Sequence, residues 1–206
     1  MLLTFDAEAH RYYWDGKPVP GVTTILAPLS DFAAVDPDVM RRASKFGTAV
    51  HYVCELVDTG EDLQHYDVDP ALLPYVDAWR KFSAEWRVQW KLIEQRVFHP
   101  TLRYAGTLDR KGTLVAPGEP EHRRHAAVVD IKTSTSLYPS VGPQLAAYAR
   151  ADDPLNGASQ RRYAVQLKGD GSYVCKEYRD ADDFATFSAL LALRTWCSRH
   201  SIKPQF

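Results

Sequence analysis

Val128-Val129-Asp130-Ile131-Lys132 is an apolar segment that carries two opposite charges towards its end. Such a segment predicts a β-strand, on which side chains alternate between the two faces. Asp130 and Lys132 then project the same way, roughly 6.5 Å apart, while Val129 and Ile131 point to the opposite side. One face of this strand is therefore predicted to carry chemistry and the other to join the core.

A carboxylate and an ammonium held side by side suit the hydrolysis of a phosphodiester. Asp130 would hold a divalent cation, and Lys132 would orient or deprotonate a water beside it. An isolated Asp-x-Lys is, however, commonly a surface ion pair without a catalytic role. The hydrolytic interpretation therefore depends on the residues that accompany the pair.

Three further motifs accompany this strand. Residues 104–109 (Tyr-Ala-Gly-Thr-Leu-Asp) predict a short strand that ends in a second carboxylate, Asp109. Gln144 and Tyr148 share one face of a predicted helix at i, i+4. His51 lies in another predicted helix, four residues after a glycine. A lone helical histidine is more often structural than a ligand, but a carboxylate site beside it reverses that preference.

Together these motifs resemble the RecB-like branch of the PD-(D/E)xK nuclease superfamily. The pattern of that branch is a helical His, then Gly-x-x-Asp, Asp-x-Lys and Gln-x-x-x-Tyr, and this sequence has all four in that order. The resemblance covers about residues 20 to 177. Residues 20–26, residues 129–134 and a late hairpin extend it to the exonucleases of phages and of mitochondrial genome maintenance.

The resemblance implies an α/β fold with a restriction-endonuclease-like core, in which a mixed β-sheet is flanked by helices. A chain of 206 residues with 45% hydrophobic content can bury one substantial core, so residues 1–206 are expected to form a single domain. Within it we expect an N-terminal hairpin and substrate-contact segment over 1–30, a catalytic core over 38–178 and a closing helix over 180–199.

Hydrophobic periodicity predicts the individual elements. Helices are expected over 38–58, 70–90 and 180–199 and from about Pro143, and strands over 92–98, 106–114, 126–132, 161–167 and 172–178. The N-terminal hairpin would turn at residues 15–16. Leu73 belongs to the predicted buried stripe of the second helix, and Trp196 to that of the closing helix. Residues 22–26 are rich in β-branched side chains, although the resemblance places a loop leading into a helix there.

The resemblance also implies a metal centre. Asp109 and Asp130 would bridge Mg²⁺ or Mn²⁺, His51 would add a nitrogen ligand, and the backbone carbonyl of Ile131 would complete the protein's share. Hard oxygen ligands favour Mg²⁺, while the imidazole makes Mn²⁺ competitive.

The predicted catalytic set consists of Lys132, Asp130, Asp109 and Glu94. Lys132 would position the attacking water. Related nucleases carry an acidic residue on the strand of Glu94 or on the helix before it, where it supports a second metal or its water. Glu94 could equally be an exposed strand carboxylate.

Hydroxyl, basic and amide side chains around these motifs are candidates for contact with substrate: Thr23, Thr24, Arg41, Lys45, Thr133, Ser134, Gln144 and Tyr148. The threonines could instead cap a helix or lie at a strand edge. Arg41, Arg42 and Lys45 share a helix that could simply present a solvated face. His122 and His125 fall in a predicted surface loop and are interpreted as solvated.

Composition restricts the cofactors and the partners. The three cysteines, Cys54, Cys175 and Cys197, form no Cys-x-x-Cys pair, which fits a reducing compartment and excludes an iron–sulfur cluster with four cysteine ligands. There is no run of 18 apolar residues, so no membrane partner is expected. We therefore expect a cytoplasmic protein, in the host cytoplasm if phage-encoded. A net charge of −1 requires DNA binding to rely on a local basic patch and on bound cations.

The function expected from the resemblance is metal-dependent DNA exonuclease activity in phage-type recombination or end processing. Its partner would be single- or double-stranded DNA with free ends, and a recombinase or a single-strand-binding protein could act with it. A flap or structure-dependent endonuclease on the same fold is an alternative, and so is a non-catalytic DNA-binding protein.

Overall fold

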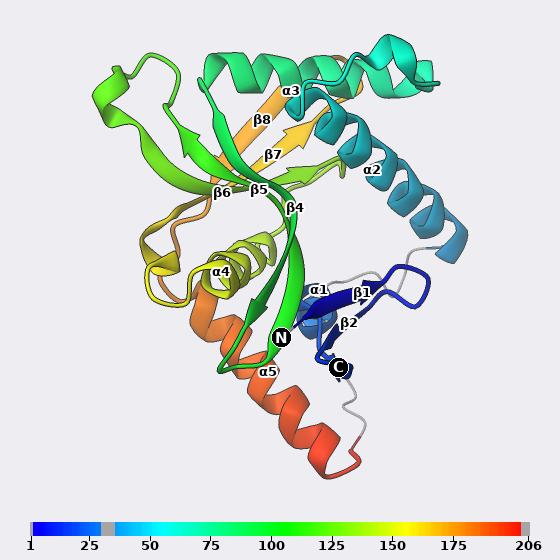
Figure 1. Ribbon diagram of the computed structural model, residues 1–206, viewed down its shortest axis with the longest axis vertical. Coiled ribbons are helices and arrows are strands. Elements are labelled where there is room, and N and C mark those ends of the chain that lie inside the picture. The colour runs from blue at the N-terminus through cyan, green and yellow to red at the C-terminus, as the bar shows by residue number, and fades with distance from the viewer. Residues whose placement is uncertain (1, 30–35, 203–206) are drawn as a thin grey trace.

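The computed structural model describes residues 2–29 and 36–202 and is an α/β structure with a mixed sheet between helices (Figure 1). Its central sheet has five strands: β4 (Gln89–His99), β5 (Tyr104–Leu114), β6 (His125–Lys132), β7 (Arg161–Leu167) and β8 (Tyr173–Glu177). They are hydrogen-bonded in that order, and only the pairing of β6 with β7 is parallel. The predicted mixed sheet is confirmed.

Helices cover both faces of this sheet. They are α1 (Val22–Leu26), α2 (Pro37–Asp58), α3 (Leu73–Glu85), α4 (Val141–Asp152) and α5 (Asp183–Arg199). Side chains of α2 and α3 form one core with β5, β6 and β7, while α4 packs on the opposite face with α1 and α5 against it. In the part of the chain that the structure describes, no helix combines the length and the apolar character that crossing a bilayer would need.

Strand β6 lies at the centre of this arrangement and alternates as predicted. Val129 and Ile131 are buried in the core under α2 and α3, whereas Val128 is buried against α4. Lys132 projects to the α4 side, where it contacts Gln144. The strand is therefore buried on both faces, and its charged side chains, Asp130 and Lys132, lie on the face that packs against α4.

The start of α2 follows from its sequence. The Asp36 side chain accepts hydrogen bonds from the backbone N–H of Asp38 (2.7 Å) and Val39 (3.3 Å), and Pro37 occupies the first turn, where it needs no donor. Residues 37–45 are all exposed, whereas Val50, Val53 and Cys54 are buried. Only the second half of α2, which carries His51, thus packs on the sheet.

Two helices differ from prediction in their extent and phase. α3 is shorter than expected, because Arg87 has a φ of 45° and β4 begins two residues later. Leu73 is 43% exposed, and Leu72 is buried instead, in a stripe with Val76 and Trp79. The 3₁₀ turn at Pro70–Leu72, which precedes the helix, determines which of its residues face the core. Trp196 is likewise 47% exposed, because it lies five residues, or about 140°, beyond the buried Leu191.

The N-terminal segment forms a small sheet rather than a single hairpin. Its strands are β1 (Leu3–Asp6), β2 (Arg11–Trp14) and β3 (Lys17–Val19), and the predicted turn at residues 15–16 joins the last two. Trp14 stacks on Phe98 of β4 with ring centroids 4.0 Å apart, which attaches this sheet to the central one. Residues 22–26 are helical despite their β-branched side chains.

Candidate metal centre

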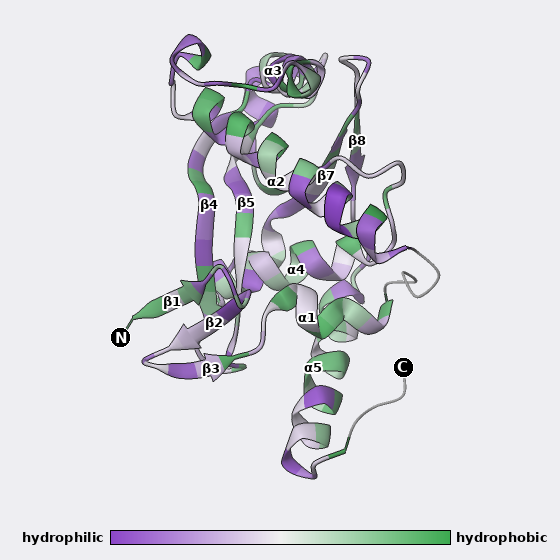
Figure 2. Ribbon diagram, turned by 90° about the vertical axis from the view of Figure 1, so that its right-hand side faces the viewer, coloured by the Kyte–Doolittle hydropathy of each residue, from purple (hydrophilic) through white to green (hydrophobic). Residues whose placement is uncertain are grey.

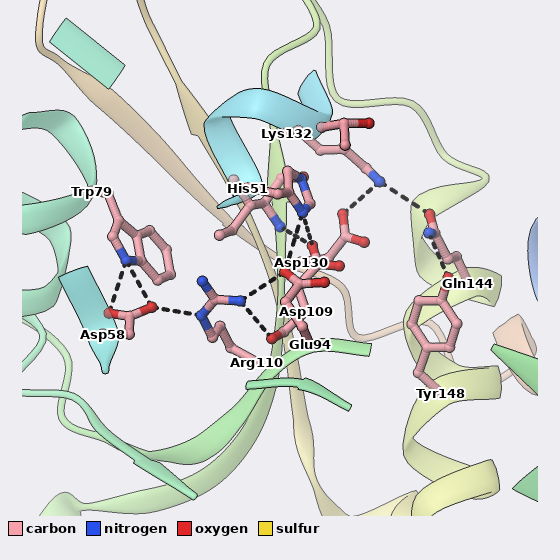
Figure 3. Close-up of polar contacts among 12 residues, drawn as sticks. His51, Asp58, Trp79, Glu94, Asp109, Arg110, Asp130, Lys132, Gln144 and Tyr148 are labelled. Carbon is pink, nitrogen blue, oxygen red and sulfur yellow. Dashed lines mark hydrogen bonds and ion pairs between the residues drawn. The ribbon is translucent and has the colours of Figure 1, made fainter. Parts of the chain in front are cut away.

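Three ligand-type side chains from three elements meet at one place. His51 comes from α2, Glu94 from β4 and Asp109 from β5, and one ligand atom of each lies within 4.8 Å of the other two (Figure 3). Asp109 lies in the interior of β5, which continues to Leu114 as the strand predicted over 106–114 does, rather than at the end of a short strand over 104–109. The residues on either side of it, Leu108 and Arg110, pair with β4.

The pairing of β4 with β5 brings the two carboxylates together. Ile93 pairs with Arg110 and Gln95 with Leu108, which sets Glu94 opposite Asp109. Glu94 has a φ of 46°, a left-handed conformation that residues with a side chain rarely adopt and that costs about 1–3 kcal/mol. From this conformation its carboxylate reaches His51 and Arg110.

The peptide groups of Ile131 orient the other two ligands. Its N–H donates to Asp109 Oδ2 (2.7 Å), and its carbonyl accepts from Nε2–H of His51 (3.0 Å). The second ring nitrogen of His51, Nδ1, consequently faces the carboxylates, 3.5 Å from Glu94 and 3.7 Å from Asp109. His51 thus presents a nitrogen to the same space as the two acidic side chains.

The glycine before His51 allows α2 to approach the end of β6. A Cβ on Gly47 would lie only 3.3 Å from Oγ1 of Thr133, which directly follows β6. Gly47 lies about one turn before His51. Because it has no side chain, α2 can pack close enough to the end of β6 for the His51 imidazole to hydrogen-bond to the Ile131 carbonyl.

Asp130 and Lys132 lie beside this cluster as an ion pair. Lys132 Nζ is 2.6 Å from Asp130 Oδ2 and also donates to Gln144 Oε1 (3.3 Å), whose amide in turn donates to the Tyr148 hydroxyl (3.2 Å; Figure 3). Oδ2 of Asp130 is buried and, despite the nearby ammonium, accepts no hydrogen bond of good geometry from any described residue. It retains a lone pair that could serve a cation.

Electrostatics show an excess of buried negative charge at the cluster. Burial alone would lower the pKa of His51, but the carboxylates of Asp109, Glu94 and Asp130 outweigh it and raise that pKa to about 9. Burial, reinforced by Asp130 and Glu94, raises the pKa of Asp109 to about 7 against the opposing charges of His51 and Lys132. The cluster of carboxylates therefore favours a positively charged group at this position.

This donor set fits a divalent cation. Two carboxylates and an imidazole nitrogen suit Mg²⁺ or Mn²⁺, and a cation would replace the proton that His51 otherwise carries between the acidic groups. Of the predicted ligands, His51 and Asp109 belong to the three-residue group, whereas Asp130 pairs with Lys132 and the Ile131 carbonyl accepts from His51. Glu94 is the third member of the group.

The residues predicted to contact substrate are dispersed. Thr23 and Thr24 are exposed on α1 and form no cap, Arg41 pairs with Asp38 (2.6 Å), and Lys45 is exposed. Thr133 is half-buried beside α2. The exposed Ser134 donates from its hydroxyl to the Ser136 carbonyl (2.8 Å). Of these eight residues, Gln144 accepts a hydrogen bond from Lys132, and Tyr148 accepts one from Gln144.

The two loop histidines differ in their surroundings. His122 is exposed, in accord with its interpretation as solvated. His125 is not: it begins β6, and its ring contacts the Tyr163 hydroxyl (3.0 Å) and the Arg123 carbonyl (3.0 Å). The expectation for His125 was wrong because the strand starts one residue earlier than predicted and pairs with Leu114.

Sequence reasoning missed a buried network behind Glu94. Arg110, fully buried, donates to Asp58 Oδ2 (2.6 Å) and to Glu94 Oε1 (2.8 Å), and Asp58 also accepts from the indole N–H groups of Trp79 and Trp90 (Figure 3). The available signal was an arginine directly after Asp109 in a strand that was predicted to be part of the sheet. Arg110 thus anchors Glu94 to the far end of the helix that carries His51.

Comparison with known proteins adds no relative to this description. The sequence matches no protein-family model, and no curated protein sequence gives a significant match.

Metal affinity should depend on pH and on His51. Because His51 and Asp109 titrate near 9 and 7 without metal and must lose protons to bind it, Mn²⁺ affinity should increase about tenfold or more from pH 6 to 9. His51→Ala should weaken Mn²⁺ binding about tenfold or more and flatten the rise above pH 7. Isothermal titration calorimetry measures both effects, with the exposed His122→Ala as the matched control. Unchanged Mn²⁺ binding in His51→Ala would show that His51 is structural.

Loss of Arg110 should destabilise the fold and disturb the metal centre together. Arg110→Met leaves Asp58, whose side chain is 4% exposed, without its cation, so the free energy of unfolding should fall by about 3–5 kcal/mol. Adding Asp58→Asn to this variant should recover part of the lost stability, because it removes the unpaired buried charge. Urea denaturation measures the change, and Arg80→Met, from an exposed pair with Asp77, should cost under about 1 kcal/mol. If Arg110→Met also lowered the free energy of unfolding by less than about 1 kcal/mol, the Arg110–Asp58–Glu94 network would not be important for stability.

Proposed function

We propose that this protein is a divalent-cation-dependent deoxyribonuclease, an exonuclease related to the RecB-like branch of the PD-(D/E)xK superfamily. One observation carries the proposal: the His51, Glu94 and Asp109 group lies directly beside the ion pair of the buried Asp130 with the partly exposed Lys132. Any of these features alone is common in proteins. Their combination at one end of β6 provides both ligands for a cation and a positioned ammonium, which is what phosphodiester hydrolysis needs.

Each residue has a defined task in this proposal. Glu94, Asp109 and His51 would hold the cation, with the buried Oδ2 of Asp130 next to them. When bound, Mg²⁺ or Mn²⁺ would supply neutralisation of phosphate charge and a lowered pKa for water. The protein contributes the orientation of the reacting groups around that charge.

Lys132 is better suited to orient water than to deprotonate it. Burial would lower its pKa, but Asp130 and Asp109 outweigh burial and raise it, so the side chain stays an ammonium. One of its three protons faces Asp130 and one is donated to Gln144, which leaves the third for a water or a phosphate oxygen. Gln144 and Tyr148 hold the ammonium in this position.

The preference for end-directed cleavage rests on the sequence resemblance and on charge. A net charge of −1 provides little general attraction for scanning along the interior of a duplex. An enzyme that captures a strand terminus near its metal centre would not need this general attraction. Endonuclease activity on branched or flapped DNA remains the alternative outcome of the test below, and action beside a recombinase or a single-strand-binding protein in the cytoplasm would be compatible with either.

Removal of the ammonium should abolish cleavage while binding persists. Lys132→Ala should lower the cleavage rate by about two orders of magnitude or more, because the water loses its orienting donor while the three-residue group keeps its ligands. Single-turnover cleavage of end-labelled DNA with Mn²⁺ gives the rate, and calorimetry gives the affinity for Mn²⁺. Cleavage within about tenfold of the parent rate would remove Lys132 from the mechanism.

Cleavage should require a free end. Linear DNA incubated with Mg²⁺ or Mn²⁺ should be degraded to short products, whereas covalently closed circles of the same sequence should persist. Gel analysis of single-stranded and duplex substrates in both forms measures this difference. Efficient nicking or linearisation of closed circles at the same enzyme concentration would favour the endonuclease alternative instead.

A further inference from the structure

A groove of about 1030 Å³ lies away from the metal ligands, between the small N-terminal sheet, the turn that joins β4 to β5, and α5. Figures 1 and 2 place β1–β3 and α5 near one another at the end of the molecule opposite α3. The walls come from three separate parts of the sequence, which meet only in the folded chain. Thr24, a predicted substrate contact, is among the residues that line the groove.

Four arginines line this groove: Arg11 from β2, Arg103 from the β4–β5 turn, and Arg194 and Arg199 from α5. All four are exposed, and no aspartate or glutamate is among the residues that line the groove. None of them forms an ion pair with a carboxylate of residues 2–29 or 36–202. The groove therefore concentrates unneutralised positive charge in a protein whose net charge is −1.

Some other exposed arginines pair with carboxylates. Arg41, Arg80 and Arg179 each lie within 4 Å of a neighbouring carboxylate, on Asp38, Asp77 and Glu177 respectively, whereas Arg42, Arg96 and Arg123 have no such partner among the described residues. What distinguishes the groove is that four arginines without a carboxylate partner in the described part of the chain line one concave surface. Their forked guanidinium groups favour phosphate oxygens over single point charges.

Side-chain contacts connect the groove to β5, the strand that carries Asp109. Tyr12, which lines it, hydrogen-bonds through its hydroxyl to Thr107 Oγ1 (2.9 Å). Thr107 lies two residues before Asp109 on the same strand, so their side chains project to the same face roughly 6.5 Å apart. On the other wall, Gly21 bridges Ala105 of β5 and leads into α1, whose Val22 packs with Tyr148.

We infer that this groove binds a single nucleic-acid strand through its phosphates and leads it to the metal centre. Regularly spaced phosphates match several separate arginines better than a compact anion would, and apolar lining residues such as Leu102 and Leu191 can contact sugars and bases. The claim that the groove guides the strand to the metal centre rests on the proposed nuclease function. The claim that the groove binds a strand does not, so binding and cleavage can be tested separately.

Binding of a fluorescein-labelled single-stranded oligonucleotide tests the inference, in EDTA so that no cleavage occurs. Arg103→Gln combined with Arg194→Gln should weaken binding about tenfold or more in fluorescence anisotropy. The slope of log affinity against log salt should decrease by about 1.4, or 0.7 for each lost phosphate contact. Arg80→Gln with Arg123→Gln, exposed at the α3 end of the molecule, is the matched control and should change affinity less than about twofold.

Three results would overturn the inference: unchanged affinity and salt slope in the groove variant, tighter binding of a duplex than of the single strand, or tighter binding of a polyglutamate peptide of equal charge. Circular dichroism and thermal melting confirm that the exposed substitutions leave the fold intact. A separate cleavage assay with Mn²⁺ distinguishes the two proposals. Arginine-dependent binding without any cleavage would contradict the nuclease function and support the groove, whereas cleavage with arginine-independent binding would contradict the groove alone.

Discussion

The arrangement of the site depends on the backbone of Ile131. Its N–H donates to Asp109 of β5, and its carbonyl accepts from His51 of α2, so one residue sets the separation of two candidate ligands. Its side chain is buried under α2 and α3 in the main core. Because core packing fixes this backbone, the same hydrophobic contacts that stabilise the domain also position the two polar side chains that hydrogen-bond to it.

Buried charge is the second constraint, and it is distributed in two layers. Asp109, Glu94 and Asp130 form an acidic layer that raises the pKa values of His51 and Lys132. Behind it, Arg110 joins Glu94 to Asp58, which two tryptophans also hold. A buried arrangement of this kind contributes little net stability compared with apolar packing. Its value is geometric, because Arg110 keeps the strained Glu94 aimed at the cluster rather than at solvent.

The distribution of charge over the whole protein resolves an apparent conflict between a net charge of −1 and a proposed polyanionic substrate. Several ionised groups outside the site pair with a neighbour, as Arg162 does with Asp183 (2.6 Å). The four arginines of the groove beside α5 form no such pair with a carboxylate of the described residues. Local charge therefore matters more here than the overall balance, since salt screens distant charges but not those at contact.

The sequence by itself predicted the order of the strands of the central sheet and of the helices around it, and the buried alternation of β6, because periods of two and 3.6 residues are local properties. The candidate roles of His51, Asp109, Asp130, Lys132, Gln144 and Tyr148 came from the resemblance of their motifs to a nuclease family. Only the tertiary structure decided that Glu94 joins His51 and Asp109, that Arg110 and Asp58 lie behind them, and that four arginines from three distant segments share one groove. These depend on strand register, on a left-handed residue and on the packing of α5, which no local pattern specifies.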